Sequence, residues 1–171
     1  MAIVRQVRGY EPVFGKDCWF AETAVLIGEI VAGEKCTFWY NAVVRGDVNA
    51  IRIGNNVNIQ DNATIHGTFE KSSTTIGDNV SIGHNAIVHG CTLESNCLIG
   101  MGAIVMDNAV IGESAIVAAG AVVLEGTKVE EGTIYAGAPA KFVKKIDDKN
   151  KEMLSRIAGN YLTYASWFQE K

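Results

Sequence analysis

The sequence predicts an all-β solenoid of stacked coils that is followed by one C-terminal α-helix. An apolar residue recurs every six positions between residues 14 and 140, and the positions between are rich in Gly, Asn and Asp. After Pro139 the apolar spacing becomes helical. We expect a single domain with a lead-in over 1–12, repeats over 13–140 and a C-terminal helix within 141–171.

The first position of each hexad is apolar. From Leu93 the series continues without a slip to Tyr135, whereas extra residues interrupt it before Ile53 and before Ile76. One residue is missing before Leu93. The fifth position is small or β-branched, and it lies two residues before the next first position. Both side chains therefore point to the same side of a strand.

A strand and turn of this size cannot bury its apolar edge alone, so successive repeats must stack. Three hexads would close one triangular coil, and the series predicts about six to seven coils. The chain has 4 cysteines, without a Cys-x-x-Cys pair. Cys18, Cys36 and Cys97 fall at the fifth position, where we interpret them as small core residues.

The C-terminal segment has the pattern of an amphipathic helix. Asp147 and Asp148 are candidate N-caps. We predict a helix over 148–169 that packs back on the solenoid. Its apolar residues follow at helical spacing: Met153, Leu154, Ile157, Ala158, Tyr161, Leu162, Ala165 and Phe168.

The composition narrows the possible partners and the compartment. Lys and Arg number 15 against 19 Asp and Glu, which gives a net charge of −4. This balance argues against nucleic acid or an anionic membrane as the main partner. The N-terminus has no apolar run of signal-peptide length, and the most apolar stretch, 98–106, is too short to span a bilayer. We expect a cytoplasmic protein.

The phase of the repeat brings two of the 3 histidines together. His66 and His89 both occupy the second position of hexads that are three apart, so they share one face in adjacent coils. Their side chains point outward, about 4.8 Å apart along the stack. Two imidazoles this close can share a metal ion.

His84 occupies the third position of a hexad on a different face. It cannot easily reach a metal held by His66 and His89 of the same chain, but a neighbour in a threefold trimer can supply it. The predicted metal site therefore lies between subunits. By the same count of hexads, Arg45 occupies the position equivalent to His66 and His89. Asp61, which follows Gln60, occupies the position equivalent to His84. Arg45 opposite Asp61 of a neighbouring chain would form an intersubunit ion pair.

Three groups of residues resemble the γ-class carbonic anhydrase family. They are Arg45-Gly46-Asp47, Asn58-Ile59-Gln60-Asp61, and the three spaced histidines. The resemblance covers nearly the whole chain and includes the tail 136–141. It implies a left-handed parallel β-helix and a homotrimer; the handedness does not follow from the repeat.

The resemblance also implies a chemistry. It places zinc, or alternatively iron or cobalt, on His66, His84 and His89, and this metal activates a water that attacks carbon dioxide. Its further site residues are Gln60, which positions the water, Asp47 and Asn58, which support the site, and Arg45 with Asp61 as the interface pair. A residue of the C-terminal helix also enters the pocket in this family, and Tyr161 is the first candidate, with Tyr164 the second.

Two departures from the family pattern concern proton transfer. The archetypal enzyme has a longer acidic loop after its first histidine, whereas here the loop 67–75 carries one carboxylate, Glu70. A second glutamate that shuttles protons is replaced by Val48. We therefore expect slow proton transfer, or transfer limited by buffer.

Two other functions remain open at this point. One is an acyl-CoA thioesterase or acyltransferase on the same scaffold. An acyltransferase needs a histidine as base, and the predicted site uses all three, but a thioesterase could use the same activated water. The other is a non-catalytic trimer whose metal only joins the subunits. That function predicts a fourth protein ligand and no open coordination position.

Overall fold

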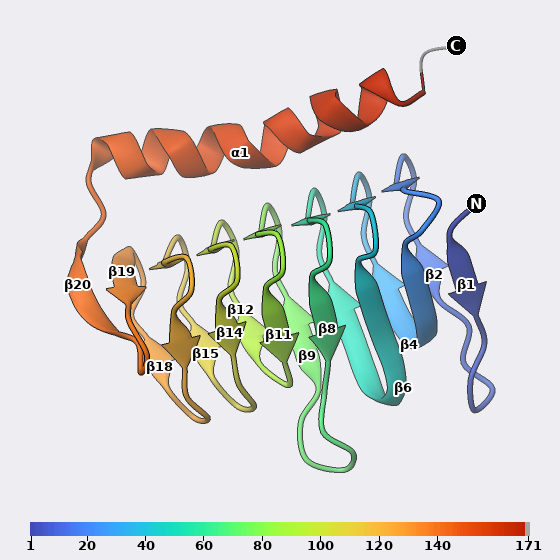
Figure 1. Cartoon of the computed structure of the whole chain (residues 1–171), viewed down its shortest axis with the longest axis horizontal. Helices are drawn as coiled ribbons and strands as arrows, with labels where there is room; N and C mark the ends of the chain where they lie inside the picture. Colours follow the sequence, from blue (N-terminus) through green and yellow to red (C-terminus); the bar gives the residue numbers. More distant parts are fainter. Residues whose placement is uncertain (170–171) are drawn as a thin grey trace.

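The computed structural model describes residues 1–169, which form 20 β-strands and one α-helix (Figure 1). The strands build a parallel β-solenoid of about 7 turns. Helix α1 (Asp148–Trp167) runs back along one side of the solenoid from its C-terminal end. The predicted fold class, a left-handed parallel β-helix with a C-terminal helix, is confirmed.

The strands lie on three faces. Strands β4 (Val25–Ala32) and β6 (Val43–Ile53) bend from the first face to the second and join them into one sheet. The first face also holds β1 (Ile3–Arg5), β8 (Thr64–His66), β11 (Ile87–His89), β14 (Ile104–Val105) and β17 (Val122–Val123). The second holds β2 (Val13–Phe14), β9 (Thr74–Ile76), β12 (Thr92–Leu93), β15 (Val110–Ile111) and β18 (Lys128–Val129). The third holds β3 (Trp19–Phe20), β5 (Thr37–Phe38), β7 (Asn58–Ile59), β10 (Ser81–Ile82), β13 (Leu98–Ile99), β16 (Ile116–Val117), β19 (Thr133–Ala136) and β20 (Lys141–Lys145).

The register follows the hexad count through both insertions. Ile53 pairs with Ile76, which pairs with Leu93, so the slips are absorbed between the repeats. The extra residues before Ile76 form a loop between β8 and β9 that projects from the solenoid (Figure 1). First-position residues point inward and most are fully buried, as the alternation predicts.

The bend between the first two faces depends on Gly28. It has φ +78°, and a Cβ on it would lie 2.4 Å from the carbonyl oxygen of Gly46 in the next coil. No L side chain fits such an approach without a shift of the backbone. The bend therefore lets β4 and β6 turn the corner in close contact.

The two ends of the chain differ from the predictions in detail. Within the lead-in 1–12, β1 pairs in parallel with β4 and so extends the first face. The segment 141–171 is not helical from its start, because 141–145 form β20, antiparallel to β19. The last coil leaves an open edge that Phe142 and Val143 can extend, with lysines beside them in solvent.

Helix α1 begins at Asp148, directly after a capping residue. Asp147 is the N-cap: its side chain accepts from the Asn150 backbone N–H at 2.9 Å, and Asn150 accepts from the Asp147 N–H at 3.1 Å. The helix ends at Trp167, two residues before the predicted end, with Phe168 as C-cap. Residues 170 and 171 of the predicted C-terminal segment lie outside the described residues.

Three of the four cysteines are fully enclosed. Cys36 and Cys97 are 1% exposed, as predicted, and so is Cys91. Cys18 is only partly buried. Within residues 1–169, no helix combines the length and apolar character that crossing a membrane requires.

Candidate metal centre

His66 and His89 form a stacked pair on the first face. They are directly paired residues of β8 and β11, and His66 Nδ1 lies 3.1 Å from His89 Nε2. The pairing exists because both follow a buried residue, Ile65 or Val88, at the same point of the hexad. The predicted stacking of the two rings is confirmed.

The outer nitrogen of each ring faces a carboxylate. His66 Nε2 lies 3.0 Å from Asp47 Oδ1, and His89 Nδ1 lies 3.2 Å from Asp107 Oδ1. A carboxylate partner holds the proton on the nitrogen that faces it. The inner nitrogens, His66 Nδ1 and His89 Nε2, then turn lone pairs toward each other. A cation between them satisfies both, so the donor set fits a metal ion.

Arg45 and Asp47 set the electrostatics beside His66. Arg45 Nη1 lies 2.5 Å from Asp47 Oδ2. Burial alone would raise the pKa of Asp47, but the hydrogen bonds from Arg45 and His66 bring it below its ordinary value. Burial lowers the pKa of His66, and the charge of Arg45 adds to this effect. His66 is thus held in the neutral form that a metal ligand needs.

Asp107 is a site residue that the sequence analysis missed. Its carboxylate accepts hydrogen bonds from Thr68 Oγ1 at 3.0 Å and from the Ser72 hydroxyl, besides facing His89. Asp107 therefore ties the loop 67–73 to the His89 ring. Its position could have been found from the count of six, because it follows Val105 in the coil stacked next to His89.

Gly90 permits this contact. A Cβ on Gly90 would lie 2.0 Å from Ser72 Oγ and 2.1 Å from Asp107 Oδ1. The loop is held from its other side by Asn49, whose Nδ2 donates to the carbonyl oxygens of Thr68 and Ser72 at 2.6 and 2.9 Å. The loop therefore has a fixed position next to the histidine pair.

His84 lies on another part of the molecule. It follows β10 on the third face, and its Nδ1 is 2.8 Å from Asp61 Oδ2, so the predicted register of these two residues is confirmed. Among the described residues, no group of three His, Cys, Asp or Glu side chains is placed to hold a metal ion. One chain therefore does not assemble the three histidines.

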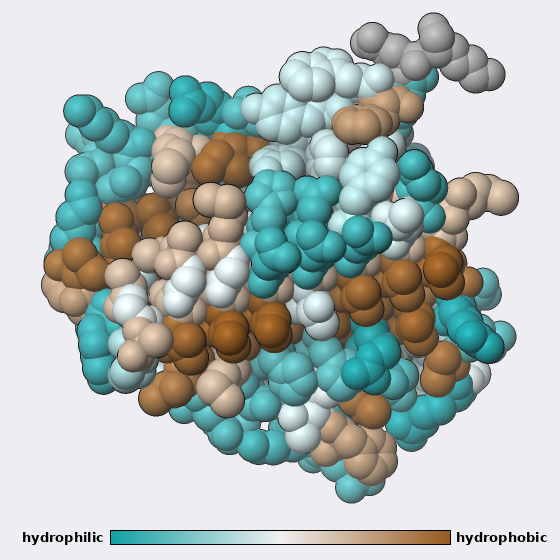
Figure 2. Space-filling view, viewed as in Figure 1, coloured by the Kyte–Doolittle hydropathy of each residue, from teal (hydrophilic) through white to brown (hydrophobic). Residues whose placement is uncertain are grey.

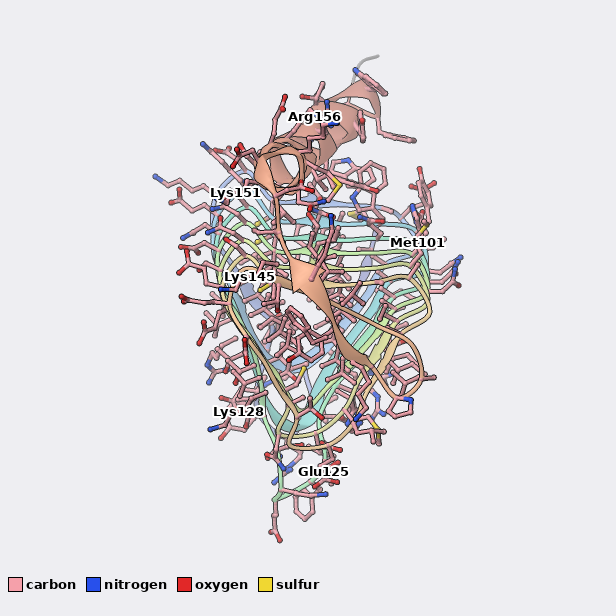
Figure 3. All side chains as sticks on the ribbon, turned by 90° about the vertical axis from the view of Figure 1, so that its left-hand side faces the viewer. Met101, Glu125, Lys128, Lys145, Lys151 and Arg156 are labelled. Carbon is pink, nitrogen blue, oxygen red and sulfur yellow. The ribbon has the colours of Figure 1, made fainter. Side chains whose placement is uncertain are left out.

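His84 lines a groove between the third face and α1. The groove has a volume of about 430 Å³, and Leu98, Met101 and Ile116 contribute to its apolar wall. Figure 3 shows Met101 pointing outward from the coil, on the side below the helix. Gln60, Tyr161 and Tyr164 line the same groove.

A short chain of hydrogen bonds orients Gln60. Its Nε2 donates to Asn58 Oδ1 at 2.9 Å, and Asn58 Nδ2 donates to Ser81 Oγ at 2.7 Å. All three side chains are buried. Asn58 thus supports Gln60, whose amide oxygen is left as an acceptor.

Tyr161 enters the groove from the helix. Its ring meets Trp39 edge to face, with centroids 5.3 Å apart. Burial raises the pKa of Tyr161 to about 12, and the charge of Asp61 acts in the same direction. The phenol is neutral at any ordinary pH and can donate a hydrogen bond.

Two predicted roles, the intersubunit pairing of Arg45 and the proton transfer of Glu70, are not seen within one chain. Arg45 contacts Asp47, and its pairing with Asp61 of a neighbouring chain stays a prediction. Glu70 is exposed on the loop, with φ +56°. Among residues 1–169 no hydrogen bond or ion pair links Glu70 to a histidine. Its part in proton transfer stays a prediction as well.

Comparisons with known proteins place the chain in a fold and a family. The family described as bacterial transferase hexapeptide (six repeats) matches residues 73–107 and 90–125. A solved structure, a hexapeptide transferase family protein from Anaplasma phagocytophilum, superposes with a TM-score of 0.93 at 37% identity. The match covers 97% of this chain and 98% of that one.

Two curated relatives share more specific names. A protein of Geobacillus kaustophilus named carbonic anhydrase is 37% identical, over 95% of this chain and 88% of its own length. Gamma carbonic anhydrase 2, mitochondrial, of Arabidopsis thaliana is 41% identical over 90% of this chain, which spans 57% of the plant protein. With this identity over nearly its whole length, the chain belongs to the γ-class carbonic anhydrase family.

Proposed function

We propose that the protein is a metal-dependent hydratase of carbon dioxide that works as a homotrimer. The metal site would use His66 and His89 of one subunit and His84 of the partner subunit. The observation that carries this proposal is the pair of inner nitrogens 3.1 Å apart, each on a ring that a carboxylate orients. This is the donor arrangement of a histidine metal site with supporting carboxylates.

Three neutral imidazoles define what the site would offer. They suit zinc, and also iron or cobalt, and leave the charge of a divalent metal uncompensated. The bound metal would supply a Lewis acid that lowers the pKa of a coordinated water to about 7. Burial lowers the pKa of His66 and so favours its neutral form, and Asp47 and Asp107 hold the outer protons of the two rings.

The remaining residues would handle the substrate. The amide oxygen of Gln60 would accept a hydrogen bond from a water molecule. This hydrogen bond would orient the lone pair of the water oxygen toward the substrate. The neutral phenol of Tyr161 would donate to an oxygen of the product. Apolar residues of the groove, such as Leu98 and Ile116, would exclude bulk water and admit an apolar molecule such as carbon dioxide.

The surface supports an assembly. Hydrophobic residues form a band along one side of the solenoid, below the helix (Figure 2). Ile87, Met101 and Met106 are 38%, 59% and 37% exposed and belong to the coils around the histidines. Exposed apolar residues of this kind favour burial against another subunit. Arg45 of one subunit and Asp61 of the partner subunit would then pair across the interface.

A second candidate is hydrolysis of an acyl thioester at the same site. The groove of about 430 Å³ is far larger than carbon dioxide needs and is lined mostly by apolar residues. An acyl chain would fit such a groove. This function would share the metal and differ only in the substrate.

The deciding experiment uses protein purified without oxygen. Elemental analysis would identify the metal, and stopped-flow assays of carbon dioxide hydration would follow on the same sample, with and without imidazole buffer. We expect one metal per subunit, slow hydration, and a faster rate with imidazole, because the loop 67–75 carries a single carboxylate, Glu70, and Val48 stands where the family has a second proton-shuttling glutamate. Loss of activity in air would indicate iron.

His84→Ala is the matched test of the shared site. We expect a folded solenoid that has lost its metal. Retention of one metal per subunit in this variant would contradict the site between subunits. A metal-loaded protein that hydrates carbon dioxide no faster than the metal-free form, yet cleaves acyl-CoA, would favour the second candidate. A loaded protein inactive in both assays would favour a metal that only joins the subunits.

A further inference from the structure

The first two coils place Cys18 and Cys36 next to each other. Both occupy the fifth position of a hexad, and the Trp19 N–H donates to the Cys36 carbonyl oxygen at 2.9 Å. The following residues, Trp19 and Thr37, are paired in the ladder of β3 and β5. The two cysteine Cα atoms are therefore about one strand spacing apart, ~4.8 Å, which is within the range of disulfides.

The surroundings of the two thiols are different. Cys18 lines a cavity of about 200 Å³ under the end of α1, together with Trp19, Leu162 and Ala165. Cys36 lies further inside and is 1% exposed. A small oxidant that enters the cavity can therefore reach Cys18, whereas Cys36 is closed to solvent.

The two sulfurs also interact. The neighbouring Cys36 thiol lowers the pKa of Cys18 to about 7, although burial opposes this effect. The same contact raises the pKa of Cys36, and its burial raises it further. Cys18 is thus the thiol with more thiolate at neutral pH, and thiolate is the reactive form.

We propose that Cys18 and Cys36 form a reversible disulfide between the first two coils, with Cys18 as the thiol that reacts first with hydrogen peroxide or a small disulfide. The Cys18 sulfur attacks the peroxide O–O bond, becomes a sulfenic acid and releases hydroxide. The Cys36 sulfur then attacks the Cys18 sulfur, the S–S bond forms and the S–OH bond breaks. Two thiols are oxidised, peroxide is reduced, and the thiol protons leave in two waters. With a small disulfide, the Cys18 sulfur attacks one sulfur of its S–S bond and releases one thiol, and the Cys36 sulfur then attacks the Cys18 sulfur of the mixed disulfide and releases the second thiol.

Cys97 provides a matched control within the chain. It occupies the same hexad position on the same corner, three coils further along, and its thiol donates to the Glu94 carbonyl oxygen at 2.9 Å. Its neighbours in the adjacent coils are Val80 and Ala115, as the pairing of Ser81, Leu98 and Ile116 shows. Cys97 shares the backbone setting of Cys36 but has no adjacent sulfur.

The test uses the full chain in its native state, treated with glutathione disulfide or hydrogen peroxide and analysed by intact mass without reduction. We expect the loss of two hydrogens, reversed by dithiothreitol, and a peptide map that joins Cys18 to Cys36. In Cys36→Ser the glutathione adduct should stay on Cys18. Cys18→Ser should remain unmodified, and Cys97→Ser should behave as the native protein.

Three outcomes would overturn the proposal. They are a lasting glutathione adduct on Cys18 of the native protein, cross-links only between chains, and unmodified thiols after full treatment. If a serine variant does not fold, alkylation of the native protein before and after oxidation decides the same question. Only Cys18 and Cys36 should then become protected, while Cys91 and Cys97 stay open to alkylation after denaturation.

Discussion

The histidine pair on the first face and the single histidine on the third face have opposite surroundings. His66 and His89 lie among charges, with Asp47, Asp107 and Arg45 in contact with them or with each other. His84 has one carboxylate partner, Asp61, and otherwise borders an apolar groove. The charged side suits the binding of a cation, and the apolar side suits an uncharged substrate.

Under the proposed function, one chain would carry two unlike halves of a site. The triangular cross-section separates them, because strands on different faces of a coil point their outer side chains in different directions. Two copies can bring unlike halves together, and threefold symmetry satisfies every half at once. Three of the predictions perturb one half and leave the other intact, and the first combines a defect in each half.

Mixing two defective variants should have the largest effect. His66→Ala and His84→Ala should each lose the metal and nearly all activity when assayed alone. When the two are unfolded and refolded together in equal amounts, about one quarter of the interfaces should combine an intact His66 with an intact His84. Metal content and hydration rate should return to about that fraction. If the mixture forms trimers but recovers neither metal nor activity, the site is not shared between subunits. The histidine pair and His84 would then act independently of each other.

Asp107→Asn tests the charged half. We expect metal affinity to fall about tenfold or more, because the variant loses the charge that orients His89. Competition with a chelator measures this affinity. Glu125→Gln is the control, since Glu125 holds the same loop through Lys71 at 2.8 Å without touching a histidine. Equal losses of metal affinity in the two variants would mean that Asp107 acts only by holding the loop.

Tyr161→Phe tests the apolar half. The metal should stay bound, and kcat/KM for hydration should fall about fivefold, the loss expected for one hydrogen bond. Tyr164→Phe should have a weaker effect, and the reverse order would assign the role to Tyr164. Because the pKa of Tyr161 is about 12, the rate should show no ionisation of this residue in the neutral range.

The smallest effect concerns acid stability of the metal-free protein. Burial lowers the pKa of His66 from its ordinary 6.5, so the unfolded chain binds a proton there at a higher pH than the folded chain does. The contribution to stability is present above pH 6.5 and is lost as the pH falls through the folded pKa. Urea unfolding between pH 7.5 and pH 5.5 should show a decline that is smaller in His66→Asn. The same decline in the variant would show that other groups cause it.

The sequence predicts best what the six-residue period controls. The period passes from coil to coil, so counting sixes places His66 against His89, and Asp61 against His84, with correct allowance for both insertions. The period says nothing about handedness, which came from the resemblance alone. The period also predicts nothing about the segments that lie outside the repeat.

The missed features all depend on contacts outside the repeat. β20 forms because the last coil has an open edge. The segment Lys141–Lys145 lacks the six-residue pattern, so the sequence does not predict a strand there. Asp107 faces His89 from the next coil, but its contacts to Thr68 and Ser72 depend on the loop 67–73, which lies outside the repeat. The groove beside Tyr161 depends on the direction in which α1 returns, which helical spacing does not determine.

The position of the histidine pair within the stack has a further consequence. β8 and β11 lie in the interior of the first face, with β6 on one side and β14 and β17 on the other. A solenoid opens from its ends, because a terminal coil has only one neighbour. Amide hydrogens of β8 and β11 should therefore exchange late. Local unfolding of the outermost coils would leave the histidine pair intact. The two ends of the solenoid would then unfold before metal binding is lost.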